Sequence, residues 1–234
     1  TQVTAEVLAA GTDLIAVGRA GIGLDNVDVA AATERGVMVV NAPQSNTLSA
    51  AEHTMALLLS QARNVPQASA ALKAGRWERS KWTGVELSDK TLGIIGLGRI
   101  GKLVAQRALA FGMKLVAYDP FVSRERFREL GVERVEAPEG VYARAEFLTL
   151  HLPLTDETRG SIGREAFGRM RDGVRLVNAA RGELVDEDLL LDEVARLALG
   201  GALVTLTTCD GASSDVLPGE ELLGLSRALL AGGA

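Results

Sequence analysis

The fold of this chain is decided by residues Thr91–Asp119, which read TLGIIGLGRIGKLVAQRALAFGMKLVAYD. An apolar run predicts a strand that ends at Gly96, and the pattern G-x-G-x-x-G continues through Gly98 and Gly101. A helix pattern follows, and a second apolar run ends in Asp119, 18 residues after Gly101. A strand, a glycine-rich turn, a helix and a strand with an acidic end together predict a dinucleotide-binding unit.

Each position of this pattern has a physical role. Gly96 permits the tight turn, Gly98 lets the backbone approach a pyrophosphate, and Gly101 lets the helix pack closely on the strand. The helix N-terminus offers unpaired N–H groups to the phosphates. Asp119 can accept hydrogen bonds from a ribose and would repel a 2′-phosphate, which favours NAD over NADP. The alternative is an ordinary strand–helix turn, with Asp119 in a surface turn, in a chain that has 26 glycines.

Outward from this segment, short apolar runs alternate with amphipathic helical stretches. The expected strands are Asp13–Val17, Gly36–Val40, Leu92–Gly96, Lys114–Tyr118, Phe147–Leu150, Val174–Asn178 and Ala202–Leu206. They lack polar alternation, which is typical of strands buried on both faces of a parallel sheet. This rhythm predicts an α/β fold with a doubly wound parallel sheet of the Rossmann type.

Capping signals predict where helices begin and end. Ser49 and Glu52 have the spacing of a capping box and predict a helix that runs to about Arg63. Three glycines stand where helices are expected to end, namely Gly11, Gly112 and Gly131. Another helix is expected over residues 220–230.

Composition narrows the class of protein. The 234 residues carry a formal net charge of -5, which disfavours nucleic acid and anionic membrane partners. The hydrophobic fraction of 47% is ordinary for a globular protein. No apolar run approaches the roughly 18 to 20 residues of a membrane span, and Thr1–Thr4 do not resemble the start of a signal peptide. Cys209 is the single cysteine, so we expect no internal disulfide and a reducing, cytoplasmic setting. No metal site is expected, because His53 and His151 lack a ligand cluster.

Charged residues near two strand ends are candidates for ligand binding. The loop Arg19–Gly23 combines exposed amides with an arginine and could hold an anion, or it could be a solvated turn. Arg181 follows a strand and could hold a substrate carboxylate, although a surface role is the common alternative. His151 could titrate near neutrality at another strand end, but a structural role is favoured, and His53 is expected to pack within its helix.

The chain closely resembles the D-isomer-specific 2-hydroxyacid dehydrogenases. The resemblance covers roughly residues 5–190. It is carried by VGRAGIGLDNVD at residues 17–28, VNAPQSNTLSAAEHTMALLL at 40–59, KAGRWERSK at 73–81, the glycine-rich segment at 90–119, HLPLTDETRG at 151–160 and VNAARGELVDE at 177–187. Within the family, the Trp77 segment and the Arg19 loop favour the branch that acts on 3-phosphoglycerate in serine biosynthesis.

The resemblance implies a role for individual positions. Arg181 matches the arginine that binds the substrate carboxylate and polarises the reacting carbonyl, and it also lies beside the cofactor. The substrate-side loop is matched by Arg19, Gly21, Ile22 and Gly23, with Ile22 also near the cofactor. The NAD contacts are matched by Gly96, Gly98, Arg99, Ile100, Gly101, Asp119, Leu152, Pro153, Ala179 and Ala180.

The resemblance also implies an organisation. Residues 1–46 correspond to part of a flavodoxin-like substrate domain, and residues 47–234 to the NAD-binding Rossmann domain with a divergent tail at 191–234. The implied partners are a small 2-hydroxy acid and a second copy of the chain, which would form a homodimer around the helices between about Ser49 and Trp77. The implied reaction is hydride transfer between the hydroxy acid and the nicotinamide.

The family's general base and its orienting acid have no counterpart in this chain. The family expects Asp-Val-Phe, Glu-Pro and Pro-His after the arginine, but the resemblance fades after about Leu190 and no histidine follows His151. Because loss of a general base costs on the order of a hundredfold to ten-thousandfold in rate, we expect impaired catalysis. A shifted reading frame near codon 190 or a divergent homologue would explain the tail. The alternatives are a glyoxylate or hydroxypyruvate reductase, or a non-catalytic NAD-binding sensor.

Overall fold

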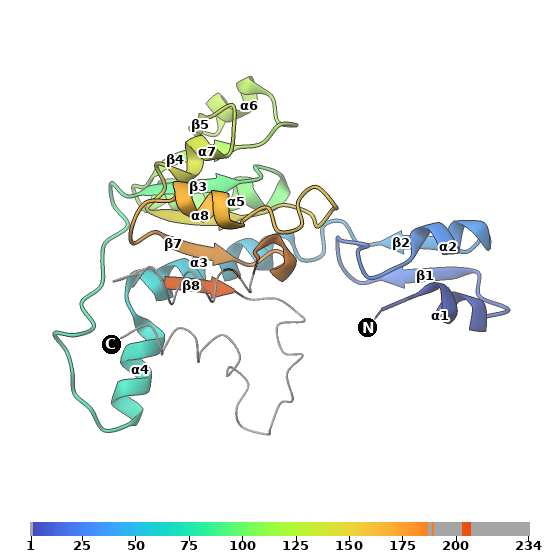
Figure 1. Ribbon diagram of the computed structural model, residues 1–234, viewed down its shortest axis with the longest axis horizontal. Helices are drawn as coiled ribbons and strands as arrows, with labels where there is room; N and C mark the ends of the chain where they lie inside the picture. The colour runs from blue at the N-terminus through green and yellow to red at the C-terminus, as the bar shows by residue number, and fades with distance from the viewer. Residues whose placement is uncertain (1, 187–188, 190–202, 207–234) are drawn as a thin grey trace. The chain divides into compact units, whose positions relative to one another are not determined.

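The computed structural model describes residues 2–186, 189 and 203–206, and it separates into two compact units, Thr1–Ala50 and Ala51–Ala234 (Figure 1). For residues 203–206 only the backbone is described. The helix α3 (Thr47–Ala62) begins in the first unit and continues into the second.

The first unit is a small α/β fragment. Its two parallel strands, β1 (Ala16–Arg19) and β2 (Met38–Asn41), pair from Ala16 with Met38 to Arg19 with Asn41. Thr4 caps α1 (Ala5–Ala10) and Asp28 caps α2 (Val29–Glu34) through side-chain oxygens. A core of Leu8, Ala32 and Val37 packs between these elements.

The second unit contains a six-stranded parallel sheet in the order β5-β4-β3-β6-β7-β8. The strands are β3 (Thr91–Ile95), β4 (Lys114–Tyr118), β5 (Glu133–Arg134), β6 (Phe147–Leu150), β7 (Arg175–Asn178) and β8 (Leu203–Leu206). Counted along the chain this order is 3-2-1-4-5-6, so the direction of winding reverses between β3 and β6. In open α/β sheets, ligands bind at the carboxyl ends of the strands beside such a reversal.

Helices cover both faces of this sheet, as Figure 1 shows for α8 in front and α3 behind. One face packs against α3, α5 (Arg99–Ala110) and α6 (Arg124–Glu129). The other face packs against α7 (Glu139–Tyr142) and α8 (Arg164–Arg169). The remaining elements are α4 (Val65–Lys73) and a 3-10 turn, Gly182–Leu184. The doubly wound parallel sheet is therefore confirmed.

The structure also corrects several expectations. Ser49 lies inside α3, which begins at Thr47, and its hydroxyl donates to the carbonyl of Asn46 instead of capping the helix. His53 is exposed on α3, so the expectation that it packs inside is wrong. The first strand begins at Ala16, three residues later than expected. The expected helix at residues 220–230 lies outside the described residues.

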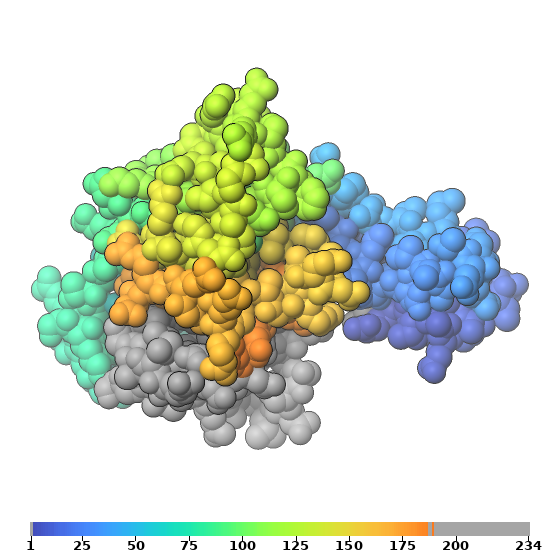
Figure 2. All heavy atoms as spheres, turned by 45° about the horizontal axis from the view of Figure 1, so that its top comes forward, coloured from blue at the N-terminus to red at the C-terminus, as the bar shows by residue number. Residues whose placement is uncertain are grey.

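The strand β5 was not expected, because its two residues are polar. Glu133 and Arg134 pair with β4 at the edge of the sheet. Glu133 forms an ion pair with Arg144, and the paired guanidinium lowers the pKa of this carboxyl. This charged edge belongs to the yellow-green part of the surface in Figure 2.

Candidate nucleotide-binding site

The glycine-rich turn after β3 has the geometry that its three glycines predict. Gly96 has a φ of 92°, and a Cβ there would lie 2.7 Å from the carbonyl oxygen of His151. A Cβ on Gly101 would lie 2.1 Å from the carbonyl oxygen of Gly96. By contrast, a Cβ on Gly98 would meet nothing within 4 Å. Two glycines thus allow close packing, and the third leaves open space beside the backbone.

The open space at Gly98 lies at the start of α5. Gly98 is the N-cap of this helix, and no side chain caps it. The first turn, with Arg99 and Ile100, therefore presents backbone N–H groups and the positive end of the helix dipole toward this space. A pyrophosphate is the kind of group that such a helix start binds.

Asp119 lies next to the glycine-rich turn, although it is 22 residues away from Leu97 in the sequence. The side chain is 8% exposed. Its Oδ2 accepts a hydrogen bond from the N–H of Leu97 at 2.8 Å, and its Oδ1 accepts from the N–H groups of Phe121 and Val122 at 2.9 and 3.2 Å. Since an ionised carboxylate has about four lone-pair sites, it retains capacity for a ribose hydroxyl.

The segment after β6 forms the neighbouring side of the site. The N–H of His151 donates to the carbonyl of Ile95, and its Nε2 lies 3.2 Å from Oγ1 of the buried Thr149. Burial lowers the pKa of His151 to about 4, so the imidazole is neutral at pH 7. A side-chain carbon of Leu152 lies 3.2 Å from where a Cβ on Gly96 would be. The carbonyl of Pro153 accepts a hydrogen bond from Oγ1 of Thr158 at 2.7 Å.

The end of β7 places Arg181 through a buried amide. Nδ2 of Asn178 donates to the carbonyl of Arg181 at 2.7 Å, and Oδ1 of Asn178 accepts from the N–H of Ala180 at 3.1 Å. Asn178 is fully buried, so this local turn is held firmly. The guanidinium of Arg181 donates to the carbonyl of Ala180 at 2.9 Å. Asn178 did not figure among the expected site residues, although an amide ending an apolar strand is a usable signal.

The Arg19–Gly23 loop belongs to the first unit and is held by hydrogen bonds within that unit. Nε of Arg19 donates to Oδ1 of Asn26 at 3.1 Å, and Nδ2 of Asn41 donates to the carbonyl of Ile22 at 2.7 Å. The carbonyl of Gly21 accepts from the N–H of Ala42 at 3.0 Å. These bonds give the loop a defined shape, with Arg19 half-buried.

The residues of the second unit fit NAD. The open face of Gly98, the uncapped start of α5 and the acidic end of β4 lie beside the winding reversal of the sheet, where a dinucleotide binds. Within the described part of the chain, no group of three or more His, Cys, Asp or Glu side chains is placed to hold a metal. Among the described helices, none combines the length and hydropathy needed to cross a bilayer.

Comparison with known protein families identifies the family of this chain. The profile of the D-isomer specific 2-hydroxyacid dehydrogenase, NAD binding domain, matches residues 55–229. This chain belongs to that family and carries its NAD-binding domain. The match extends past residue 190, beyond which we expected the resemblance to fade.

Individual relatives make the similarity more specific. The D-3-phosphoglycerate dehydrogenases of Mycobacterium tuberculosis and Methanocaldococcus jannaschii are 56% and 50% identical to the chain over 194 and 192 residues, or 83% and 82% of it. In both cases the chain spans 37% of the length of the relative. Among solved structures, D-lactate dehydrogenase from Aquifex aeolicus, complexed with NAD and lactic acid, matches with a TM-score of 0.78 and 32% identity. That match covers 100% of this chain and 66% of the other.

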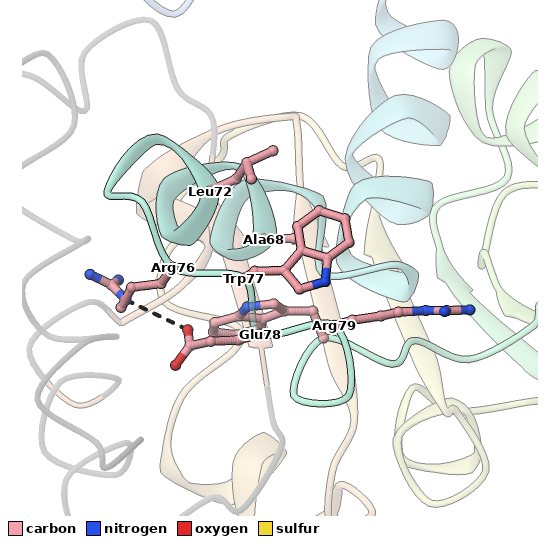
Figure 3. Close-up of a pocket in the computed structure, with 7 residues that line it drawn as sticks. Ala68, Leu72, Arg76, Trp77, Glu78 and Arg79 are labelled. Carbon is pink, nitrogen blue, oxygen red and sulfur yellow. Dashed lines mark ion pairs between the residues drawn. The ribbon is translucent and has the colours of Figure 1, made fainter.

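A separate hollow lies at α4 and the segment after it. This cavity of about 440 Å³ is lined by Ala68, Leu72, Arg76, Trp77, Glu78, Arg79 and Trp82 (Figure 3). Trp77 is 79% exposed and Leu72 57% exposed, so the hollow presents apolar surface. The ion pair between Arg76 and Glu78 borders the hollow. None of the lining residues belongs to the nucleotide site.

Proposed function

We propose that this chain serves an NAD-dependent oxidoreductase that acts on a D-2-hydroxy acid, with 3-phosphoglycerate as the substrate. The cofactor assignment rests on the open space beside Gly98 and on Asp119, whose carboxylate accepts a hydrogen bond from the neighbouring Leu97. The substrate half is supported by the names of the relatives that are at least half identical to the chain. Bound NAD supplies hydride transfer to or from C2 of the acid.

The chain's own residues then have separable roles under this proposal. Gly96, Gly98 and Gly101, with Arg99 and Ile100 at the helix start, hold the pyrophosphate. Asp119 holds the adenosine ribose, and the NAD groove is lined by Leu152, Pro153, Ala179 and Ala180. Arg181 binds the substrate carboxylate and polarises the carbonyl, because a guanidinium presents a planar fork of donors to an oxyanion.

The first unit supplies the substrate side. We assign residues 1–46 to part of a substrate domain and residues 47–234 to the cofactor domain. The Arg19–Gly23 loop contributes amides and a guanidinium to the substrate, and Ile22 also lies near the cofactor in this assignment. The shape of the loop, held by Asn26 and Asn41, supports this role.

A second candidate function is NAD binding without turnover. The chain has two histidines, and both precede Arg181 in the sequence. His151 is neutral and faces Thr149, and His53 is exposed on α3, and within the described residues neither histidine forms an ion pair with a carboxylate, as a general base held by an orienting acid would. This observation favours an impaired catalyst or a nucleotide sensor. A reductase of glyoxylate or hydroxypyruvate is the third candidate.

Two measurements on the full chain separate these functions. Fluorescence titration with NADH tests the cofactor site, with Gly98→Ala as the control that fills the open space. Steady-state assays with 3-phosphoglycerate, D-glycerate, glyoxylate and hydroxypyruvate then test turnover and preference. Turnover highest with 3-phosphoglycerate supports the proposal. Tight NADH binding without turnover supports the sensor, and failure to bind NADH contradicts both.

We further propose that the chain forms a homodimer through α3, α4 and the segment that ends near Trp77. The hollow of Figure 3 and the exposed Trp77 support this surface, because aromatic side chains such as tryptophan are enriched at the centres of interfaces. A sedimentation mass close to that of one chain at micromolar concentration would count against the dimer.

A further inference from the structure

Two neighbouring residues, Asn26 and Gly21, restrain the guanidinium of Arg19. Oδ1 of Asn26 accepts a hydrogen bond from Nε of Arg19 at 3.1 Å. The guanidinium also lies across Gly21, because a Cβ built there would be 1.8 Å from Nη1 and 3.0 Å from Cζ of Arg19. These two neighbours restrain the half-buried Arg19 side chain, whereas unrestrained arginines sample many rotamers.

This orientation leaves the terminal nitrogens of Arg19 for another partner. Of the donors of a guanidinium, Nε carries one N–H, and the others lie on Nη1 and Nη2 in a planar fork. That fork matches an oxyanion such as a carboxylate or a phosphate.

We propose that Asn26 is a positioning residue that binds Nε of Arg19 and so holds Nη1 and Nη2 for an oxyanion of the 2-hydroxy acid. The inference rests on the proposed function, and it adds a residue that the family resemblance does not assign to the site. A side chain that is already fixed loses less conformational entropy when it binds its ligand. Gly21 contributes by leaving room for the guanidinium.

A double-mutant cycle tests this role in the full chain with NADH present. The variants are Asn26→Ala, Arg19→Ala and the combination of the two. The binding of 3-phosphoglycerate and of D-glycerate is measured by calorimetry for each. We expect Asn26→Ala to weaken binding by about tenfold when Arg19 is present, and by less than about twofold when Arg19 is alanine.

A second variant covers the case in which Asn26→Ala does not fold. Gly21→Ala places a methyl group against the flexible end of Arg19, so it displaces the guanidinium with little strain elsewhere. We expect a weaker affinity for the acid with an unchanged melting temperature. The Nε–H resonance of Arg19 in a nitrogen-15 NMR spectrum reports the contact directly, and we expect Asn26→Ala to shift it.

The outcomes are distinguishable. A loss confined to 3-phosphoglycerate assigns the guanidinium to the phosphate, and an equal loss with D-glycerate assigns it to the carboxylate; both support the role of Asn26. The same loss with and without Arg19 would overturn it. If the unaltered chain binds NADH but neither acid, the proposed substrate class fails. If the unaltered chain binds the acids and Asn26→Ala binds them equally well, only the proposed role of Asn26 fails.

Discussion

Oδ2 of Asp119 accepts a hydrogen bond from the backbone N–H of Leu97 at 2.8 Å. This bond joins the end of β4 to the glycine-rich turn after β3. Asp119, which we propose binds the ribose, and the turn that we propose binds the pyrophosphate are therefore parts of one site. Leu97 is itself 3% exposed, which fixes the turn from the side of the core.

Substitution of Asp119 should affect both stability and cofactor choice. Asp119→Ala leaves the N–H groups of Leu97, Phe121 and Val122 without their acceptor, so we expect the free energy of unfolding to fall by about 1–3 kcal/mol. The loss of negative charge should weaken NADH binding and reduce the discrimination against NADPH. Fluorescence titrations with both nucleotides and urea unfolding measure these effects. Asp119→Asn, which keeps an acceptor oxygen, is the control that should retain more stability. Unchanged discrimination in both variants would refute the ribose role.

Two glycines of the turn should respond differently to alanine. A methyl group on Gly101 would collide with the carbonyl of Gly96, so Gly101→Ala should cost about 1–3 kcal/mol of stability as well as NADH affinity. A methyl group on Gly98 meets open space, so Gly98→Ala should keep the melting temperature and lose NADH affinity. Thermal unfolding and NADH titration of both variants test this contrast. Wild-type NADH affinity in Gly98→Ala would show that the open space does not hold the cofactor.

Burial of His151 should make stability depend on pH. The pKa of His151 is lowered to about 4 in the folded chain, against 6.5 for an unperturbed histidine. As the pH falls from about 6.5 to about 4, the unfolded chain binds a proton that the folded chain does not. The free energy of unfolding should therefore fall by up to about 1.4 kcal/mol per pH unit from this group.

The variant His151→Gln isolates this effect, because the carboxylates that titrate in the same range are present in both proteins. Urea unfolding at pH 7, 6 and 5 should give a shallower pH dependence for the variant than for the unaltered chain. Parallel curves would mean that His151 is accessible to protons when folded.

Trp77 should matter for association and little for folding. Its side chain is 79% exposed, so Trp77→Ser should leave the melting temperature of the monomer unchanged. If Trp77 lies at the centre of the dimer interface, its loss should weaken the dimer by at least about thirtyfold. Sedimentation velocity over a concentration series measures this constant. Phe121→Ser removes another aromatic side chain, 95% exposed, and should leave the dimer intact.

Several elements could be predicted because their signals are local. The strand–turn–helix of the nucleotide site follows from an apolar run and from closely spaced glycines whose roles are steric. Lys114–Tyr118 and Phe147–Leu150 were expected with the boundaries that the structure has. The helix-ending glycines Gly112 and Gly131 have φ values of 73° and 66°, as their positions predict.

Other features depend on partners that are distant in the sequence. Strand β5 has no apolar pattern and exists because β4 offers it a free edge. Ser49 has the spacing of a cap, yet α3 begins earlier and the hydroxyl turns to Asn46. The sequence contains Asn26 but gives no sign that its amide binds Arg19.

The sequence alone determined the class of fold and the identity of the glycine and aspartate positions, because apolar runs, helix starts and turn sterics depend on short stretches of residues. Tertiary structure alone decided that Asp119 meets Leu97, that His151 lies against Gly96 and is neutral, and that β6 pairs with β3. The physical reason is that strand order and burial arise from packing between segments tens of residues apart, and neither is encoded in any one segment.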